Sequence, residues 1–388
     1  MQHKTITTVL FFASMQITMG QITTHDLSGT INLLTVAVPF LTIPQSPSIN
    51  GVITSVPDGT SGPGIYGNPG LLALDHARFQ STIDFVPWLR NRIPDMNLYG
   101  LGGCYRLNGK HSIGMNFRFF SLGSYTAVVG NTTRHFSPSE FAGTIFYTYN
   151  IDRLTGIGIG IKYISSDLVG GQNVGSISTH PVRAIAIDLG FAKQFPGRNG
   201  QMDHFLGISL KNAGSKISYT QNSDKDFIPI TLTAGYGLRV NLKEQQSISL
   251  SYEVSKLLVP TPPVYYSDSV DLNGDPVIQA GYDPNVGVFR GMIQSFYDGP
   301  GGYQEEFNEI THSVGIVYKY HFISAGLGYF RQQPTKGNHQ FFTAGLSGRV
   351  KIGPADTNQC RISISYLIPV NKYPKSGNTI QFEINLSI

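Results

Sequence analysis

The feature that most constrains this chain is an alternation of apolar and polar side chains that recurs from residue 77 to the C-terminus. In the last segment the apolar residues Ile380, Phe382, Ile384, Leu386 and Ile388 alternate with Thr379, Gln381, Glu383, Asn385 and Ser387. The same alternation recurs at 156–163, 231–239 and 247–254. A period of two residues indicates β-strands that have one apolar and one polar face.

The lengths of the strands and of their connections distinguish two all-β folds. A soluble β-sandwich also alternates, but these segments approach the roughly 9–11 residues that cross a bilayer at a tilt. Short polar breaks at 107–110, 150–154, 195–203, 241–245, 319–321 and 353–359 alternate with mostly longer ones at 87–95, 122–138, 166–181, 220–227, 256–310, 331–339 and 369–377. Outer-membrane barrels have short periplasmic turns and long extracellular loops. We therefore predict an all-β fold, a transmembrane antiparallel outer-membrane β-barrel of about 14 strands.

The two faces of the predicted strands have different environments. The apolar row, expected to face lipid, includes Phe117, Phe119, Ile159, Leu232, Tyr252, Ile316, Tyr318 and Ile384. The opposite row, expected to face the lumen, includes Asp84, Arg118, Lys162, Asp188, Arg239, Glu253, Lys319, Arg349 and Glu383. Their mixed signs favour a structural network over a permeation path. The same parity turns Cys104 inward and Cys360 outward, so these two residues are not expected to form a disulfide.

The N-terminal region precedes the strand pattern. Residues 1–20 combine His3 and Lys4 with a short apolar run and are expected to be a signal peptide. Residues 21–76 are rich in proline and glycine, and we expect them to plug the barrel, because a barrel of about 14 strands is wider than its own side chains can fill. The barrel itself is expected at 77–388. A net charge of +4 without a Lys/Arg run gives no indication of nucleic-acid binding.

The break at 256–310 is too long for an ordinary connection, and loops longer than about 15 residues are usually functional. Phe289, Met292, Ile293 and Phe296 recur at helical spacing, as do Tyr303, Phe307 and Ile310, with Glu305, Glu306 and Glu309 opposite them. These two helices fit either a lid over the barrel mouth or a docking surface. The preceding proline run favours an extended arm suited to docking. The predicted partner-binding residues are Leu258, Val259, Pro260, Pro262, Pro263, Tyr265, Phe289, Met292, Phe296, Tyr303 and Phe307.

Several strings, in this order and spacing, resemble the PorV (LptO) family, the outer-membrane subunits of the type IX secretion system within the FadL-like barrels. They are VPFLTI at Val38, GNPGLLAL at Gly67, FVPWLRNRIPDMNLYG at Phe85, SKISY at Ser215, KDFIPITLTAGYG at Lys225, KLLVPTPPVY at Lys256, GMIQSFYDGPGGYQEEFNEITHSVG at Gly291 and YLIPV at Tyr366. The resemblance runs from Val38 to the C-terminus. It implies a barrel of about fourteen strands with an N-terminal plug, in agreement with the alternation.

The resemblance also implies a non-enzymatic role and a set of partners. Such subunits dock beside a large translocon barrel of the SprA/Sov type and bind cargo proteins by their C-terminal signal domains. They then carry the cargo to a sortase-type attachment complex at the cell surface, while outer-membrane lipid surrounds them. The expected location is the outer membrane of a Gram-negative bacterium.

Two other functions remain as alternatives. A FadL-type channel for hydrophobic small molecules is compatible with the fold and the plug. An outer-membrane lipid (LPS) deacylase would need a Ser/His pair, but His312 and Ser313 are sequence neighbours and point to opposite faces of their strand. The acidic residues Asp268, Asp271, Asp275 and Asp283 do not have the spacing of a calcium loop. We therefore predict no catalytic, cofactor or metal site.

Overall fold

The computed structural model describes residues 31–44, 53–57, 65–90, 93, 95–129, 132–168, 178–197, 200–220, 225–243, 245–272, 274–352, 358–370 and 378–388. The expected signal peptide at 1–20 lies outside these residues, as does part of the expected plug at 21–76. The boundaries of these two segments therefore remain predictions.

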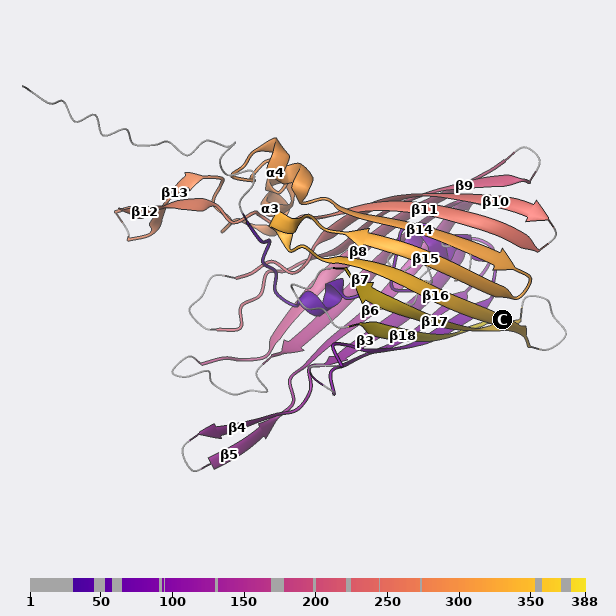
Figure 1. Cartoon of the computed structure of the whole chain (residues 1–388), viewed down its shortest axis with the longest axis horizontal. Helices are drawn as coiled ribbons and strands as arrows, with labels where there is room; N and C mark the ends of the chain where they lie inside the picture. Colours follow the sequence, from indigo (N-terminus) through magenta and orange to yellow (C-terminus); the bar gives the residue numbers. More distant parts are fainter. Residues whose placement is uncertain are drawn as a thin grey trace, which may run out of the picture.

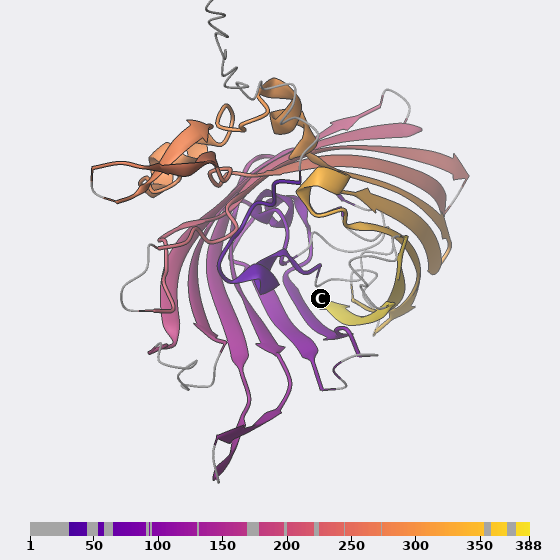
Figure 2. The same ribbon diagram turned by 60° about the vertical axis from the view of Figure 1, so that its left-hand side comes forward.

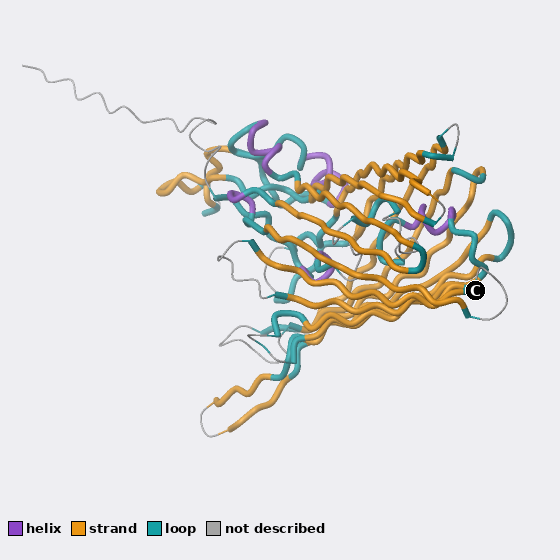
Figure 3. Tube along the Cα trace, turned by 45° about the vertical axis from the view of Figure 1, so that its right-hand side comes forward, coloured by secondary structure: helices purple, strands orange, loops and turns teal. Residues whose placement is uncertain are grey.

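Fourteen antiparallel strands close into a barrel in the order β1-β18-β17-β16-β15-β14-β11-β10-β9-β8-β7-β6-β3-β2 (Figures 1 and 3). The predicted fold class and strand number are thus confirmed. The strands are β1 (Phe79–Pro87), β2 (Asn97–Arg106), β3 (His111–Ser121), β6 (Ser139–Asp152), β7 (Thr155–Asp167), β8 (Val182–Pro196), β9 (Met202–Gly214), β10 (Thr231–Lys243), β11 (Gln246–Leu257), β14 (Thr311–Tyr320), β15 (Ile323–Arg331), β16 (Gln340–Lys351), β17 (Gln359–Pro369) and β18 (Thr379–Ser387).

Two hairpins extend beyond the barrel at the end that carries the long connections (Figure 1). They are formed by β4 (Tyr125–Val129) with β5 (Thr132–Phe136), and by β12 (Val264–Val270) with β13 (Pro276–Ala280). The remaining elements are the short helices η1 (Pro39–Thr42), α2 (Pro69–Leu74), α3 (Val288–Gln294), α4 (Tyr303–Asn308) and η2 (Pro334–Lys336). Within the described part of the chain, none of the helices is long and apolar enough to span a bilayer.

The predicted faces of the strands are confirmed by burial. Phe117, Ile159 and Ile384, which were assigned to lipid, are exposed, whereas Arg118 and Glu253, which were assigned to the lumen, are buried. The predicted parity of the cysteines is also confirmed. Cys104 and Cys360 are both free thiols, the first buried inside the barrel and the second in phase with the outward Ile362.

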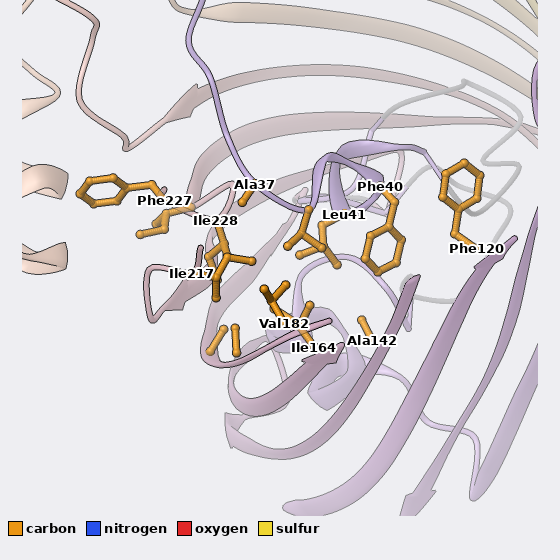
Figure 4. Close-up of a cluster of buried hydrophobic side chains, with 14 of the residues drawn as sticks. Ala37, Phe40, Leu41, Phe120, Ala142, Ile164, Val182, Ile217, Phe227 and Ile228 are labelled. Carbon is orange, nitrogen blue, oxygen red and sulfur yellow. The ribbon is translucent and has the colours of Figure 1, made fainter. Parts of the chain in front are cut away.

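Most of the described part of the N-terminal segment lies inside the ring of strands (Figure 2), whereas Ile31 is 77% exposed. Phe40 stacks on Phe120 with their ring centroids 6.2 Å apart, and Leu41 belongs to the same buried cluster (Figure 4). The Arg118 guanidinium donates hydrogen bonds to the carbonyls of Phe40, Leu41 and Ile43 at 2.8–3.2 Å. This lumenal charge therefore holds backbone that would otherwise be buried without a partner.

A second lumenal charge binds the segment on the opposite part of the wall. The Glu253 carboxylate accepts hydrogen bonds from the backbone N–H groups of Thr54 and Ser55 at 2.8 and 2.7 Å, and from the Ser55 hydroxyl at 2.5 Å. Asn68 caps α2 by accepting from the Gly70 N–H at 2.9 Å. Arg118 and Glu253 thus act in a structural network, as their mixed signs indicated.

Candidate partner-binding surface

The connection between β11 and β14 holds the β12–β13 hairpin followed by α3 and α4, which lie side by side above the barrel wall (Figures 1 and 2). This is the end of the barrel that carries the long loops, and long loops are extracellular in outer-membrane barrels. We therefore expect the insertion to lie at the cell surface.

Helix α3 turns its small and polar residues toward the protein. Gly291 lies so close to Phe227 that an added Cβ would be 2.5 Å from the ring. The Gln294 side chain is buried and donates to the carbonyl of Asp283 at 2.9 Å. On the other side, Phe289 is 76% exposed and Ile293 is 50% exposed. Phe289 and Ile293 thus face away from the barrel, whereas Val288 and Met292 pack against the core cluster.

Helix α4 has the same inverted arrangement. Its acidic residues Glu305 and Glu306 are buried, together with Glu309 just beyond its end. Tyr303 is 82% exposed and Phe307 is 71% exposed. We call the exposed side chains of Phe289, Ile293, Phe296, Tyr303 and Phe307 the aromatic face. Large exposed apolar side chains that gather in one region are typical of a surface that binds another molecule.

A buried group of charges holds α4 in this orientation. The Lys256 ammonium lies 2.9 Å from the Glu306 carboxylate and 2.5 Å from that of Glu309. The Lys336 ammonium, from η2, lies 2.5 Å from Glu305 and 2.9 Å from Glu309. Charges are buried only when ion pairs and hydrogen bonds compensate their desolvation. These residues, which we call the buried charge cluster, join α4 to the end of β11 and to η2.

Hydrogen bonds complete the buried charge cluster. The Thr261 hydroxyl donates to Glu309 at 2.7 Å, and the Gly299 and Gly301 N–H groups donate to Glu306 and Glu305 at 2.7 and 2.6 Å. The Asn32 side chain donates to Glu305 at 3.0 Å. The cluster therefore joins the N-terminal segment, the proline run and α4 into one packed unit.

A further buried carboxylate, that of Asp298, lies beside the cluster and accepts a hydrogen bond from the Thr261 N–H at 3.1 Å. Burial raises the pKa of the Asp298 carboxyl to about 7; the Thr261 hydrogen bond opposes this rise and the nearby Glu306 carboxylate adds to it. Burial likewise raises the pKa of Glu306. These two acids retain protons in the folded protein at pH values where exposed acids have lost them.

This protonation predicts that the insertion loses stability as pH rises. In the unfolded chain Asp298 ionises near pH 3.9, but in the folded chain its pKa is about 7, so between these values the folded state binds more protons. Stability therefore falls between about pH 4 and pH 7. Hydrogen exchange of the α4 amides, corrected for intrinsic rates, should show protection falling by roughly 100-fold from pH 5 to pH 8.

The variant Asp298→Asn should flatten this pH dependence, because an amide imitates the protonated carboxyl. A smaller slope due to Glu306 should remain. The exposed Asp275 of the same insertion provides the control, and Asp275→Asn should keep the wild-type slope. Equal slopes in both variants would show that Asp298 is not the titrating group.

The structure places the predicted partner-binding residues in two environments, and part of the set is buried. Leu258 and Val259 are buried in the main core cluster, which also contains Val38 and Phe40, and Pro260 and Pro263 are buried as well. The proline arm is covered by the N-terminal segment and by α3, so these residues cannot contact a partner in this conformation. Pro262 is half-buried and its carbonyl accepts from Asn32.

The remaining predicted residues divide between the core and the surface. Met292 packs against the core cluster instead of sharing a face with Phe289. Tyr265, Phe289, Phe296, Tyr303 and Phe307 are exposed, and their role in binding stays a prediction. The sequence reasoning missed Lys256 and Lys336 as the partners of the glutamates. One indication of such partners was present in the sequence, because Glu305, Glu306 and Glu309 share a helical face on which no cation lies beside them.

Two observations concern the alternative functions, a channel for hydrophobic molecules and a lipid deacylase. A cavity of about 30 Å³ in the described lumen is lined in part by Arg118, Lys162, Asp188 and Lys211. Its size suits a water molecule, and its charged lining differs from the apolar sites that hold hydrophobic ligands. The His312 imidazole lies 2.7 Å from the Tyr252 hydroxyl on the outer face, whereas Ser313 is buried inside. Their predicted divergence is confirmed.

Sequence comparison identifies the family of this barrel. A family model described as type IX secretion system protein PorV matches residues 28–264, which is more than half of the chain. The chain belongs to the PorV family. It is therefore an outer-membrane component of the type IX secretion system of a Gram-negative bacterium. Among curated proteins no match was found.

Solved structures with a similar fold include transporters from other bacteria. The toluene transporter TbuX of Ralstonia pickettii is 11% identical, with a TM-score of 0.47 over 87% of this chain and 96% of that chain. The toluene transporter TodX of Pseudomonas putida is also 11% identical, with a TM-score of 0.46 over 92% of this chain and 98% of that chain. A FadL homologue of Pseudomonas aeruginosa is 10% identical, with a TM-score of 0.43 over 89% and 98% of the two chains.

Proposed function

We propose that this member of the PorV family receives secreted proteins at the type IX translocon barrel, binds their C-terminal signal domains and carries them to the sortase-type attachment complex. The aromatic face is the docking surface for these partners. The observation that carries this proposal is the inverted orientation of α3 and α4, which exposes Phe289, Tyr303 and Phe307 by 71–82%.

The buried charge cluster supports a docking surface over a lid. A lid would turn its apolar residues toward the barrel mouth, where the hydrophobic effect would hold them. Here four ion-pair contacts and several hydrogen bonds hold the acidic side of α4 inside instead. Exposed aromatic side chains on a rigid support are typical of binding hot spots.

The test is affinity purification of the full-length protein from detergent-solubilised outer membrane, followed by quantitative mass spectrometry. The double variant Phe289→Ser/Phe307→Ser removes two exposed anchors without touching the core. We expect recovery of the translocon barrel or of cargo to fall at least about tenfold, because hot-spot side chains contribute about 2 kcal/mol or more each.

The matched control is Leu272→Ser, which removes a fully exposed apolar side chain from the β12–β13 hairpin of the same insertion. This variant should recover the same partners as the wild type. Substitutions are preferable to deleting residues 259–266, because that deletion would also remove the buried Val259. Unchanged recovery of both translocon and cargo by the double variant would refute the assignment of the aromatic face.

A further inference from the structure

Two arginines face each other on the inner wall of the barrel, at the end that carries the short turns. Arg349 on β16 and Arg361 on β17 are register partners, and both share the inward face with the buried Ser347 and Ser363. The Cβ atoms of such partners lie roughly 5 Å apart, and like charges placed directly opposite each other destabilise a sheet. This pair therefore needs a negative charge to offset its repulsion.

A third cation adds to the positive charge at this place. Lys319 is the last inward-facing residue of β14, and its ammonium interacts electrostatically with both guanidinium groups and with that of Arg239. Within the described residues, no carboxylate contributes to this interaction. The Arg349 guanidinium also donates to the carbonyl of His321, in the turn that follows Lys319, at 3.2 Å. The cations are thus held together at one end of the lumen.

Arg361 is the most buried of these cations. Its side chain lies on the inner face of β17 with the residue only 7% exposed, and its Nη1 atom has no hydrogen-bond partner. None of the ion pairs between described residues includes Arg361. Buried charges in folded proteins are normally paired, and buried donors are normally satisfied by protein, water or an ion. The Arg361 guanidinium can therefore donate to an anion.

Short hydroxyl side chains lie between the cations. Ser324, Ser347 and Ser363 are successive register partners in the row of inward residues that begins at Lys319. All three are buried. The Ser363 hydroxyl donates to the Ser347 hydroxyl at 3.3 Å, so the Ser347 hydroxyl keeps its own hydrogen to donate elsewhere. This part of the wall thus combines positive charge with small side chains that can donate hydrogen bonds.

We propose that Lys319, Arg349 and Arg361 form a binding site for a small, water-soluble phosphate anion at the periplasmic end of the lumen. Guanidinium groups match phosphate oxygens with two parallel N–H bonds. A phosphate group carries about 1.5–2 negative charges at pH 7, which suits several cations. Lipid phosphates lie outside the wall, whereas these side chains face inward. A folded partner cannot reach the buried Arg361, so a small free anion is the ligand that fits.

The test is isothermal titration calorimetry of the purified full-length protein in an uncharged detergent, with inorganic phosphate as the ligand at constant ionic strength. Arg361→Gln should lower the affinity for phosphate at least about tenfold, because it removes a charge-assisted hydrogen bond. Arg361→Lys keeps the charge without the planar fork and should give an intermediate affinity. The control Arg153→Gln removes an exposed cation from the turn between β6 and β7 at the same end, and it should bind phosphate as the wild type does.

A second measurement separates a binding site from a structural arginine. Without phosphate, Arg361→Gln should unfold at a higher temperature than the wild type, because the repulsion from Arg349 is gone. Phosphate should raise the unfolding temperature of the wild type but not that of Arg361→Gln. Arg349→Gln, on the neighbouring strand, should behave in the same way. Heat-modified migration on gels measures the unfolding temperature and verifies that each variant folds into a barrel.

Three results would overturn the proposal. The first is the absence of phosphate binding by the wild type, and the second is undiminished binding by both Arg361→Gln and Arg349→Gln. The third is a lower unfolding temperature of both variants with and without phosphate, which would make the arginines structural. Acetate serves as the competing probe, and equal affinity for acetate and phosphate would refute the assignment to phosphate by making this a general carboxylate site.

Discussion

Replacing Glu309 with alanine is expected to lower the free energy of unfolding of the extracellular insertion by about 3 kcal/mol, because it breaks a buried ion-pair group. Glu309 is 3% exposed and bridges both cations of the buried charge cluster, while also accepting from Thr261. Lys256 and Lys336 would each keep one glutamate, so the expected loss lies at the lower end of the range for buried pairs. Hydrogen exchange of α4 and proteolysis of residues 288–310 measure this loss.

The same variant separates the support of the aromatic face from the face itself. Glu309 is not accessible to a partner, yet its loss should release α4 and reduce recovery of translocon and cargo. The exposed Gln304 on the same helix is the matched control, and Gln304→Ala should change stability by no more than about 0.5 kcal/mol. If the α4 amides exchanged as slowly in Glu309→Ala as in the wild type, the buried charge cluster would not be what holds this helix.

Replacing Glu253 with alanine is expected to release the N-terminal segment from the barrel wall. Two backbone N–H groups and two hydroxyls, from Thr54 and Ser55, would lose their acceptor. Leaving buried donors unsatisfied costs about 1–3 kcal/mol each before relaxation, so the segment should lose most of its local stability. Limited proteolysis should cleave the N-terminal segment faster, and planar-bilayer recordings should show a higher conductance.

The variant Glu253→Gln is the appropriate comparison, because its amide oxygen can replace Oε2, which accepts from both backbone N–H groups and the Ser55 hydroxyl, while its NH₂ group faces the Thr54 hydroxyl in place of Oε1. The proteolysis rate and the conductance of Glu253→Gln should lie between those of the wild type and of Glu253→Ala. Wild-type proteolysis and conductance in Glu253→Ala would mean that Arg118 and the apolar core hold the segment without Glu253.

The barrel was predictable from the sequence because its determinants are local. Alternation along β18, from Thr379 to Ser387, assigns each side chain to lipid or lumen, and the lengths of the connections assign each end of the barrel to one side of the membrane. The prediction that His312 and Ser313 point to opposite faces required only the alternation of side chains along a strand. Such features depend on neighbours one or two positions away, so a single sequence contains them.

The insertion was predicted less well because burial there depends on distant residues. Helical spacing identified apolar and acidic faces on α4 but not which of them is buried. The hydrophobic effect alone would bury the apolar face. Two lysines, 53 residues before and 27 residues after Glu309, reverse that outcome by pairing with the acidic face.

Alternation along the strands and the lengths of the connections were enough to predict an outer-membrane barrel and which side chains face lipid. Three features became apparent only in the folded chain: the proline run is core, the aromatic side chains of α3 and α4 are exposed, and Asn68 and Pro69 pack against β7 and β8. The physical reason is the same for all three. Each depends on contacts between segments far apart in the chain, namely the N-terminal segment with the wall and the proline run, and Lys256 and Lys336 with α4.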